Sequence, residues 1–536
     1  MSTQLKTPGV YIEEVSKLPP SVAQVETAIP AFIGYTAKAT RKKENDLNLT
    51  PTRVTSLLEY EQFFGGANAL QLVLQEDITN GSIVQQPTEK FLMYYALQMY
   101  FANGGGPCYI VSVNTFIDEN DDVNTVIDNE LIGGLNTLER EDEPTLLVFP
   151  DAISISEEVK FYEVYKQALL QANTLKDRFV IMDTYTGDPS TIAKFRAGVA
   201  GDRYGAAYYP HLNTVLSYNY GEDVMIKHIG TLGHDFSDEI DELTELSKED
   251  NDISNATDAQ GKEADVQAII DSINATLNLD TPVPSDLDVS SASQFKKSIK
   301  DFLKALGAQK EAVGAYYGIT FGVLKLNHPT AYASIQRQIQ AMSVVLPPSA
   351  AIAGVYARID STRGVWKAPA NTGLSYVSSL TEKVTHNDQH DLNVDTKAGK
   401  SINVIRNFTG KGILVWGART LDGNSNEWRY VSVRRFFNMV EESVKKAVDQ
   451  FVFEANDAKT WIKVKTMIEN FLNQQWRAGA LAGATPKEAY YVSVGLNETM
   501  SAQDILEGRM NVEIGMAAVR PAEFIILQFS HKLQES

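Results

Sequence analysis

The sequence has a single cysteine, Cys108, among its 536 residues, and this scarcity excludes a fold stapled by internal disulfide bonds. It also lacks any apolar run of the roughly 18 residues that a membrane-spanning helix requires. Residues 1–6 lack the apolar core of a secretory signal peptide. We therefore expect a chain that folds in a reducing cytoplasm and does not insert into a membrane.

Basic side chains are in deficit, since 48 Lys and Arg stand against 68 Asp and Glu and leave a net charge of −20. This balance argues against direct nucleic-acid binding, because phosphate contacts need clustered Lys and Arg. The charge is also unevenly placed. Residues 235–288 carry a net charge of −14, whereas residues 400–480 carry +5. Such sorting indicates surfaces that face different partners.

The hydrophobic content of 43% is ordinary for globular proteins, and the length predicts three or four domains. Short apolar runs alternate with helical spacers between residues 145 and 211, which predicts a βαβαβ unit with parallel strands. The expected strands are 146–149, 179–182 and 205–209, and the expected helices are 157–175 and 189–199. Residues 235–290 are acidic and poor in aromatics, and this composition predicts an inserted helical segment.

Both ends of the chain carry β-favouring runs that have no local hairpin partner. Residues 7–15 form one such run, which Pro19 and Pro20 separate from an expected buried strand at 28–35. Residues 523–529 form another run close to the other end of the chain. Strands of this kind need a distant partner, in this chain or in another.

Two helices are expected before the last strands, at residues 433–456 and 459–477. The first has an apolar stripe at i, i+3 and i+4 spacing, which is typical of a helix buried on one face. The charged side chains lie largely on its other face. Its cations, which could contact an anionic partner or simply face solvent, include Arg434, Arg435, Lys445 and Lys446.

Polar residues follow the predicted parallel strands, where ligands gather in α/β sheets. Asp151, Asp183 and His211 occupy these positions, and Ser349 begins a helix and could act as a nucleophile. The alternative is that the aspartates are turn or cap residues and that Ser349 is an N-cap. We favour the alternative, because the sequence has no Gly-x-Ser-x-Gly elbow.

A second cluster could hold a metal ion, although a solvated loop is the favoured interpretation. It contains His386, Asp388, His390 and Asp391, in a segment without helical periodicity that would preorganise ligands. A glycine run at 104–106 lacks the Lys-Ser/Thr of a phosphate loop. We expect no metal, no cofactor and no nucleotide.

Several motifs, in the same order, resemble those of contractile phage tail sheath proteins. The resemblance covers the first 35 residues and most of 350–530. The motifs are Thr7-Pro-Gly-Val-Tyr-Ile-Glu-Glu14, Ala28-Ile-Pro-Ala-Phe-Ile-Gly-Tyr35, Gly354-Val-Tyr-Ala-Arg-Ile-Asp360, Gly364-Val-Trp-Lys-Ala-Pro-Ala-Asn371, Gly412-Ile-Leu-Val-Trp-Gly-Ala-Arg-Thr420, Trp428-Arg-Tyr-Val-Ser-Val-Arg-Arg435 and Arg520-Pro-Ala-Glu-Phe-Ile-Ile526.

This resemblance implies a structural subunit, not an enzyme, that stacks as hexameric rings around an inner tube and contracts. The fold it implies is a multidomain α/β and α+β chain with a subtilisin-like α/β domain that lacks catalysis. An assembly domain would comprise residues 1–35 and 355–536, with the outer domains at 36–354. Within the outer domains, residues 145–354 would be α/β and the 235–290 insertion would lie outermost. The alternative function is a subtilisin-like hydrolase that uses Ser349.

The resemblance also implies partners and contact residues. Neighbouring sheath subunits, the inner tube, the baseplate and a terminal cap are the expected partners, in a phage tail or a contractile injection particle that can be released from the cell. The terminal strands would be exchanged between subunits through Val10, Tyr11, Ile12 and Glu13 and through Phe524, Ile525, Ile526 and Leu527. Arg434, Arg435, Lys445 and Lys446 would face the tube.

Overall fold

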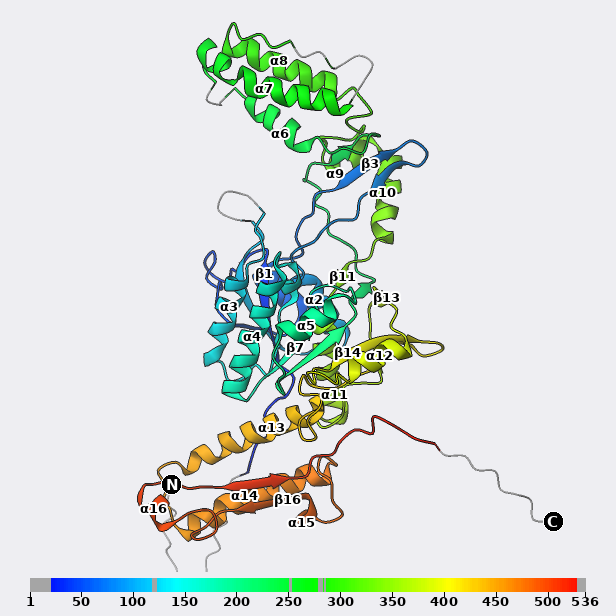
Figure 1. Cartoon of the computed structure of the whole chain (residues 1–536). Coiled ribbons are helices and arrows are strands. Elements are labelled where there is room, and N and C mark those ends of the chain that lie inside the picture. The colour runs from blue at the N-terminus through cyan, green and yellow to red at the C-terminus, as the bar shows by residue number, and fades with distance from the viewer. Residues whose placement is uncertain (1–20, 118–122, 250–252, 278–282, 284–285, 528–536) are drawn as a thin grey trace, which may run out of the picture.

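The chain is arranged in tiers, with a large sheet domain between a helical bundle and a second, smaller unit (Figure 1). The computed structural model describes residues 21–117, 123–249, 253–277, 283 and 286–527. The bundle lies at one end of the molecule, and the smaller unit, which contains most of the C-terminal fifth of the chain, lies at the other end.

The central domain is built on a nine-stranded sheet. Its strands, in spatial order, are β12 (Thr372–Gly373), β15 (Gly412–Val415), β14 (Ile402–Phe408), β8 (Gly205–Tyr209), β7 (Phe179–Asp183), β6 (Leu146–Val148), β1 (Pro30–Thr36), β5 (Cys108–Thr115) and β2 (Thr52–Val54). The six strands from β14 to β5 run parallel, and the outer pairings of β2, β12 and β15 are antiparallel.

Helices cover both faces of this sheet, so its inner strands are buried throughout. Every residue of β1 is buried, as expected for a parallel strand with helices on each side. Phe32 packs into the core on one face, and Ile33 packs into the core on the other. The helices are α1 (Leu57–Phe64), α2 (Met93–Ala102), α3 (Asp128–Thr137), α4 (Glu158–Leu175), α5 (Thr191–Gly198), α11 (Ser349–Arg363) and α12 (His386–Asn393), with short 3₁₀ turns η1 (Leu138–Arg140) and η2 (Pro150–Ser154).

The predicted βαβαβ unit is confirmed, because β6, β7 and β8 pair in parallel and α4 and α5 connect them. The sheet extends beyond that unit in both directions. β1 inserts between β5 and β6, and β14 extends the sheet beyond β8. The boundaries expected at residues 35 and 355 therefore differ from the observed organisation, since both positions lie inside this sheet domain.

Two small sheets connect the sheet domain to the outer part of the chain. One contains β3 (Val73–Asp77), β4 (Gly81–Val84) and β10 (Lys227–Ile229), and the other contains β9 (Leu212–Thr214), β11 (Val345–Leu346) and β13 (Val377–Leu380). The helices here are α9 (Phe321–Asn327), α10 (Pro329–Ala341) and the bundle of α6 (Ser237–Leu246), α7 (Ala256–Leu277) and α8 (Ala292–Leu306). The acidic insertion is therefore helical, and it packs around a core of its own.

The smaller unit, here called the C-terminal unit, comprises residues 431–519 together with residues 22–27. Its elements are α13 (Val431–Val448), η3 (Asp449–Phe451), α14 (Ala458–Arg477), α15 (Pro486–Ala489), β16 (Tyr490–Ser493), α16 (Ala502–Leu506) and β17 (Glu513–Met516). The apolar stripe of α13 packs into a core with α14, and Val22 joins this core. The predicted first helix is confirmed, although α13 ends at Val448 and not at residue 456.

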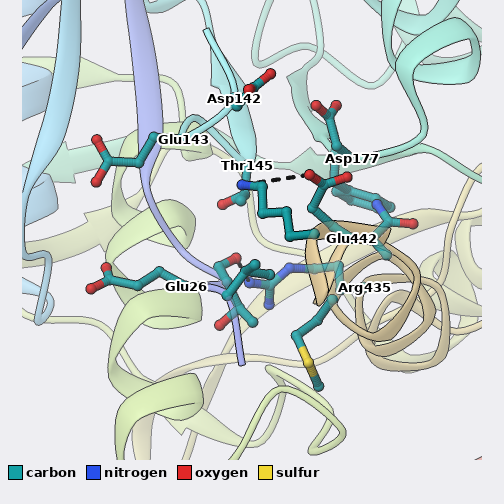
Figure 2. Close-up of a pocket in the computed structure, with 13 residues that line it drawn as sticks. Glu26, Asp142, Glu143, Thr145, Asp177, Arg435 and Glu442 are labelled. Atoms are coloured by element: carbon teal, nitrogen blue, oxygen red, sulfur yellow. Dashed lines mark hydrogen bonds and ion pairs between the residues drawn. The ribbon is translucent and has the colours of Figure 1, made fainter. Parts of the chain in front are cut away.

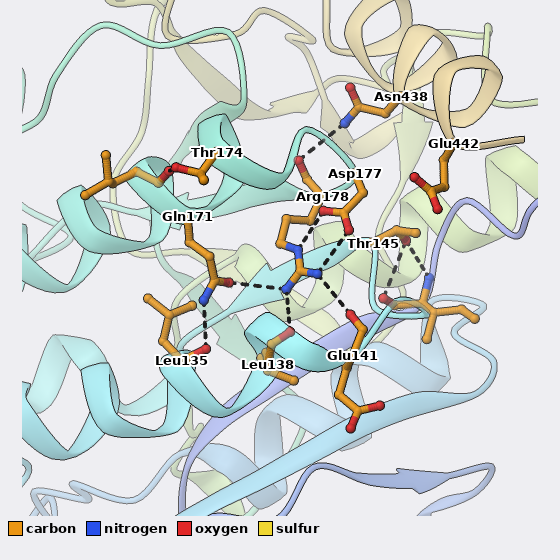
Figure 3. Close-up of polar contacts among 12 residues, drawn as sticks. Leu135, Leu138, Glu141, Thr145, Gln171, Thr174, Asp177, Arg178, Asn438 and Glu442 are labelled. Carbon is orange, nitrogen blue, oxygen red and sulfur yellow. Dashed lines mark hydrogen bonds and ion pairs between the residues drawn. The ribbon is translucent and has the colours of Figure 1, made fainter. Parts of the chain in front are cut away.

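A buried polar network joins the C-terminal unit to the sheet domain (Figure 3). The Arg178 guanidinium is almost fully buried and donates hydrogen bonds to the carbonyls of Leu138 (2.9 Å) and Glu141 (3.0 Å). The amide of Asn438 on α13 donates to the Arg178 carbonyl at 3.3 Å. The position of α13 is thus fixed against the loop that leads into β7.

Candidate assembly interface

A run of four large apolar side chains lies in solvent at the C-terminal end of the described chain. Phe524, Ile525, Ile526 and Leu527, here called the C-terminal arm, are 71%, 78%, 83% and 71% exposed. The arm is in neither a helix nor a strand, and no other described strand pairs with it. Large apolar side chains that are exposed together are typical of an interaction surface.

The residue that precedes the arm is firmly attached to the sheet domain. The Glu523 carboxylate accepts hydrogen bonds from the Arg419 guanidinium (2.6 and 2.9 Å), the Asn393 amide (2.8 Å) and the Tyr430 hydroxyl (3.1 Å). Burial alone would raise the pKa of Glu523, but the hydrogen bonds from Arg419 and Asn393 outweigh it and hold the pKa below its usual value. Glu523 is therefore ionised at neutral pH.

The C-terminal unit contains a two-stranded sheet, and no other named strand of the described chain covers its edges. β16 and β17 pair antiparallel, with Tyr490 opposite Met516 and Ser493 opposite Glu513. Among the described residues, no further named strand pairs with either of them. A two-stranded sheet is marginally stable by itself, and its open edges can accept added strands.

The N-terminal residues predicted for strand exchange lie outside the described part of the chain. These are Val10, Tyr11, Ile12 and Glu13. The first described segment leaves from the C-terminal unit, where the backbone N–H of Val25 donates to the Ser443 hydroxyl on α13 at 3.0 Å. Any arm formed by the preceding residues therefore starts next to α13.

Arg434 and Arg435 are not on the surface where the sequence placed them, since each side chain is only 3% exposed. Arg434 lies 4.3 Å from the centre of the Trp428 ring and pairs with Glu441 at 2.9 Å. Arg435 pairs with Asp360 on α11, at 3.0 Å from Oδ1. The amphipathic pattern identified the polar face of α13 correctly, but the sheet domain covers the part of that face where these arginines lie.

Lys445 and Lys446 remain accessible at the far end of α13. Their side chains are 67% and 42% exposed, and both lie within 3.5 Å of Glu442. They are the two of the four predicted tube-facing cations that another molecule can reach in this chain.

A cavity of about 270 Å³ separates the end of α13 from the sheet domain (Figure 2). Carboxylates from several elements surround it, namely Glu26, Asp142, Glu143, Asp177 and Glu442. Arg435 lies in its wall and is engaged with Asp360. The cavity thus marks an acidic opening at the joint between the two units.

The last part of the chain matches a known family model, the phage tail sheath C-terminal domain, over residues 424–532. The tail sheath protein of Vibrio phage KVP40 is 24% identical over 187 residues, which are 34% of this chain and 26% of that protein. A putative prophage major tail sheath protein of Pseudomonas aeruginosa strain UCBPP-PA14 is 26% identical over 186 residues, 33% of this chain and 44% of that one. The matched segments therefore span less than half of each of these relatives.

Solved structures match along the whole chain. The contracted helical sheath of the anti-feeding prophage is 29% identical, with a TM-score of 0.57 over 98% of this chain and all of that one. The whole chain is thus similar to a contractile sheath subunit. The contracted PVC sheath complex, from an extracellular contractile injection system, is 25% identical to this chain, with a TM-score of 0.56 over 99% of each chain. The mixed α/β multidomain fold is thus that of contractile sheath structures.

The polar residues at the carboxyl edge of the sheet act as caps. Asp151 accepts hydrogen bonds from the backbone N–H groups of Tyr35 (2.7 Å) and Met93 (3.1 Å). Asp183 accepts one from the backbone N–H of Ser349 at 2.8 Å, at the start of α11. Asp183 and Ser349 do meet, but through the main chain of Ser349.

His211 does not complete a catalytic triad with them. Its Nε2 lies 3.0 Å from the Thr184 carbonyl, and no hydrogen bond joins it to Ser349 or Asp183 within the described residues. Burial lowers the pKa of His211 to about 4, although its contact with that carbonyl acts in the opposite direction. The geometry therefore does not favour the hydrolase alternative.

The histidine segment at 386–391 is a helix and not the loop that its composition predicted. A capping box between Thr385 and Asp388 starts α12, in which the first turn is exposed. No cluster of three potential metal ligands occurs in the part of the chain that the structure describes. A search of the same residues finds no helix long and apolar enough to cross a membrane.

Sequence reasoning missed the residues that hold the units and the arm in place. The motifs that carry the family resemblance contain Arg419, Glu523 and Asp360. Nothing in those motifs distinguishes these three from other charged residues. Their partners are more than 70 residues away in sequence. Only a signal that links distant positions could have paired them.

Proposed function

We propose that this chain is the structural subunit of a contractile sheath. It polymerises as stacked hexameric rings around an inner tube, and it contracts to drive the tube through a target envelope. The observation that carries the proposal is the match to contracted sheaths along 98–99% of this chain. The particle is a phage tail or an extracellular injection system that is assembled in the bacterial cytoplasm.

Assembly uses strands exchanged between subunits. The C-terminal arm of one subunit and the N-terminal residues Val10 to Glu13 of another add to the β16–β17 sheet of a third by β-augmentation. The exposed arm and the edges of the β16–β17 sheet, which no other named strand of the described chain covers, support this arrangement. About five new backbone hydrogen bonds, at about 1 kcal/mol each, stabilise each added strand by several kcal/mol.

The sheet domain has a structural role and no catalytic one. Its run of parallel strands with helices on both faces supports a subtilisin-like topology. The carboxylates at the sheet edge are used as caps for the backbone N–H groups of Tyr35 and Ser349. We assign no cofactor, no metal and no direct contact with nucleic acid.

The other partners follow from the sheath role. The inner tube is contacted by the exposed cations Lys445 and Lys446, and rings at the two ends of the sheath contact the baseplate and a terminal cap. An anti-feeding prophage chain that is 29% identical over its whole length belongs to a baseplate structure, which supports the baseplate contact. The acidic bundle α6–α8 lies at the end of the molecule opposite the C-terminal unit (Figure 1), and in the sheath we expect it to face outward.

Negative-stain electron microscopy of the purified chain tests this proposal. Three samples are compared: the full chain, a variant that lacks residues 1–20 and a variant that ends at Glu523. We expect rings or striated tubes from the full chain and only small particles from both shortened variants. A matched control is Ile78→Asp, which changes an apolar side chain that is 90% exposed but far from the arm, and which should polymerise normally.

Small, uniform particles from the full chain, with tube and baseplate supplied, would refute the sheath function. Polymers from the variant that ends at Glu523 would refute the C-terminal strand exchange while leaving the sheath function intact.

A further inference from the structure

The C-terminal segment is fastened at two points with a short span between them. The first point is a backbone hydrogen bond from Val519 N–H to the Ala480 carbonyl in the C-terminal unit, at 3.1 Å. The second is the Glu523 carboxylate, which is held against the sheet domain by Arg419. Residues 520–527 make no backbone hydrogen bond to other described residues. Side chains alone therefore decide where the C-terminal arm begins.

The second point is held by several hydrogen bonds, although the rest of the segment makes no backbone hydrogen bond to other described residues. Four donor groups contact the Glu523 carboxylate, namely Nε and Nη2 of Arg419, the Asn393 amide and the Tyr430 hydroxyl. The Arg419 side chain is 5% exposed, and the Glu523 side chain is 22% exposed. The neighbouring Phe524 is 71% exposed. A nearly buried cation thus holds a carboxylate that solvent can still reach.

We propose that the Glu523–Arg419 pair is a releasable clamp that sets the free length of the C-terminal arm. While the pair is closed, the arm starts at residue 524. When it opens, residues 520–523 join the arm and extend its reach by up to about 14 Å, at about 3.5 Å for each extended residue. The clamp thereby gives an exchanged strand enough slack to stay paired when neighbouring subunits change position.

The inference rests on the proposed strand exchange, and two features make the clamp releasable. Opening it breaks side-chain contacts only, because the span that it frees makes no backbone hydrogen bond to the described residues. Its carboxylate also lies near the surface, where water can replace the lost donors. When the clamp opens, Nη1 of Arg419 still donates to the carbonyls of Asn393 and Gly423, at 3.4 Å each, so the guanidinium keeps partners in the sheet domain.

Insertions on either side of the clamp test the proposal in the full chain. One variant carries Gly-Ser-Gly-Ser between Glu523 and Phe524, which lengthens the arm while the clamp stays closed. The matched control carries the same insertion between Arg520 and Pro521, where a closed clamp confines it. Glu523→Gln weakens the clamp without changing the length of the chain, because it removes the negative charge that pairs with Arg419, and Glu507→Gln controls for the loss of one carboxylate.

The first measurement is the distance between spin labels on cysteines introduced at Leu527 and Lys411, in soluble subunits with the buried Cys108 replaced by serine. We expect the distance distribution to broaden at least twofold in Glu523→Gln and in the downstream insertion. The upstream insertion and Glu507→Gln should match the parent chain. An unchanged distribution in Glu523→Gln, or equal broadening by the two insertions, would overturn the clamp.

The second measurement is the ring spacing of polymers from the same variants. We expect the downstream insertion and Glu523→Gln to give less uniform spacing than the parent chain and the upstream insertion. Identical spacing in all variants would overturn the role of the clamp in the sheath. A parent chain that forms no polymer would instead refute the proposed function, and the label distances separate that outcome from a failure of the clamp.

Discussion

Arg435 on α13 and Asp360 on α11 form an ion pair in which both side chains are almost entirely buried, at 3% and 7% exposure. The Arg435 guanidinium also donates to the Thr27 carbonyl at 2.7 Å and lies 4.5 Å from the centre of the Tyr356 ring. One side chain thus connects α13, α11 and the segment that leads into β1. This pair couples the C-terminal unit mechanically to the sheet domain.

We predict that Arg435→Ala destabilises the chain by about 3–5 kcal/mol, because it leaves the Asp360 carboxylate buried and unpaired. Denaturant unfolding measures the effect. The matched control is Lys445→Ala, at the exposed end of the same helix, which should cost far less. The double variant Arg435→Met, Asp360→Asn should recover part of the loss, and a loss equal to that of Arg435→Ala would contradict the assignment.

A second prediction concerns pH. Burial raises the pKa of Asp183 to about 7, although the hydrogen bond from the Ser349 backbone N–H acts in the opposite direction. The folded chain therefore holds this proton more tightly than the unfolded chain, whose carboxyl titrates near 4. The stability that the proton contributes is complete below about pH 4 and is lost as pH rises to about 7, at a slope of up to about 1.4 kcal/mol per unit.

Asp183→Asn should remove this term, so the variant loses less stability than the parent chain between pH 5 and pH 7. Its Oδ1 can still accept from Ser349 N–H, so the fold is preserved. Thermal unfolding midpoints measured across this range test the prediction. Parallel pH profiles for variant and parent would show that Asp183 does not titrate in this window.

Asp151→Asn should behave differently, although burial also raises the pKa of Asp151 to about 7 against the opposing hydrogen bond from Tyr35 N–H. Both carboxylate oxygens of Asp151 accept backbone hydrogen bonds, Oδ2 from Tyr35 and Oδ1 from Met93. An amide offers one acceptor, so a buried N–H is left unpaired at a cost of about 1–3 kcal/mol. Unfolding at pH 7 that leaves Asp151→Asn as stable as Asp183→Asn would contradict this reasoning.

The C-terminal arm should show a two-residue periodicity once it is paired. In a strand, Phe524 and Ile526 point to one face and Ile525 and Leu527 point to the other. The face that packs on the acceptor core should tolerate Asp substitutions far less than the other face. We expect one of the two double-Asp variants to reduce the polymerised fraction at least tenfold more than the other, as measured by sedimentation. Equal effects would argue against a strand.

The tube contact is tested at the accessible end of α13. Lys445→Glu combined with Lys446→Glu should weaken co-sedimentation with the inner tube, most strongly at low salt, because exposed charges are screened as ionic strength rises. Lys383→Glu combined with Lys411→Glu, which changes two exposed lysines of the sheet domain, is the matched control for net charge. Unchanged binding at low salt would refute the tube-facing assignment of these two lysines.

Much of the local structure could be predicted from the sequence alone. Strands β6, β7 and β8 were predictable because a parallel strand covered on both sides must be apolar throughout, which leaves a short, recognisable run. Helices α13 and α14 were predictable from their apolar stripes. The end of α13 was not, since the apolar pattern continues through η3 and does not distinguish a helix from the turns that follow it.

Of the candidate contact residues, those with a local sequence signal could be predicted, and those buried by distant parts of the chain could not. The exposed arm at residues 524–527 was found from the sequence, because its apolar run has no local partner. Arg434 and Arg435 were assigned to a free surface, because helical periodicity separates a polar face from an apolar one but does not reveal what covers the polar face. The contacts with Trp428 and Asp360 that bury them come from other parts of the chain.

The sequence by itself determined the class of elements, the parallel unit, the acidic insertion and the unpartnered apolar run at residues 524–527, since these depend on composition and on periodicities of a few residues. Only the tertiary structure decided that β1 lies between β5 and β6, that Asp183 caps α11 and that Glu523 fastens the C-terminal arm. Each of these contacts joins groups that lie far apart in the chain. Their contact depends on how whole elements pack, which no local pattern encodes.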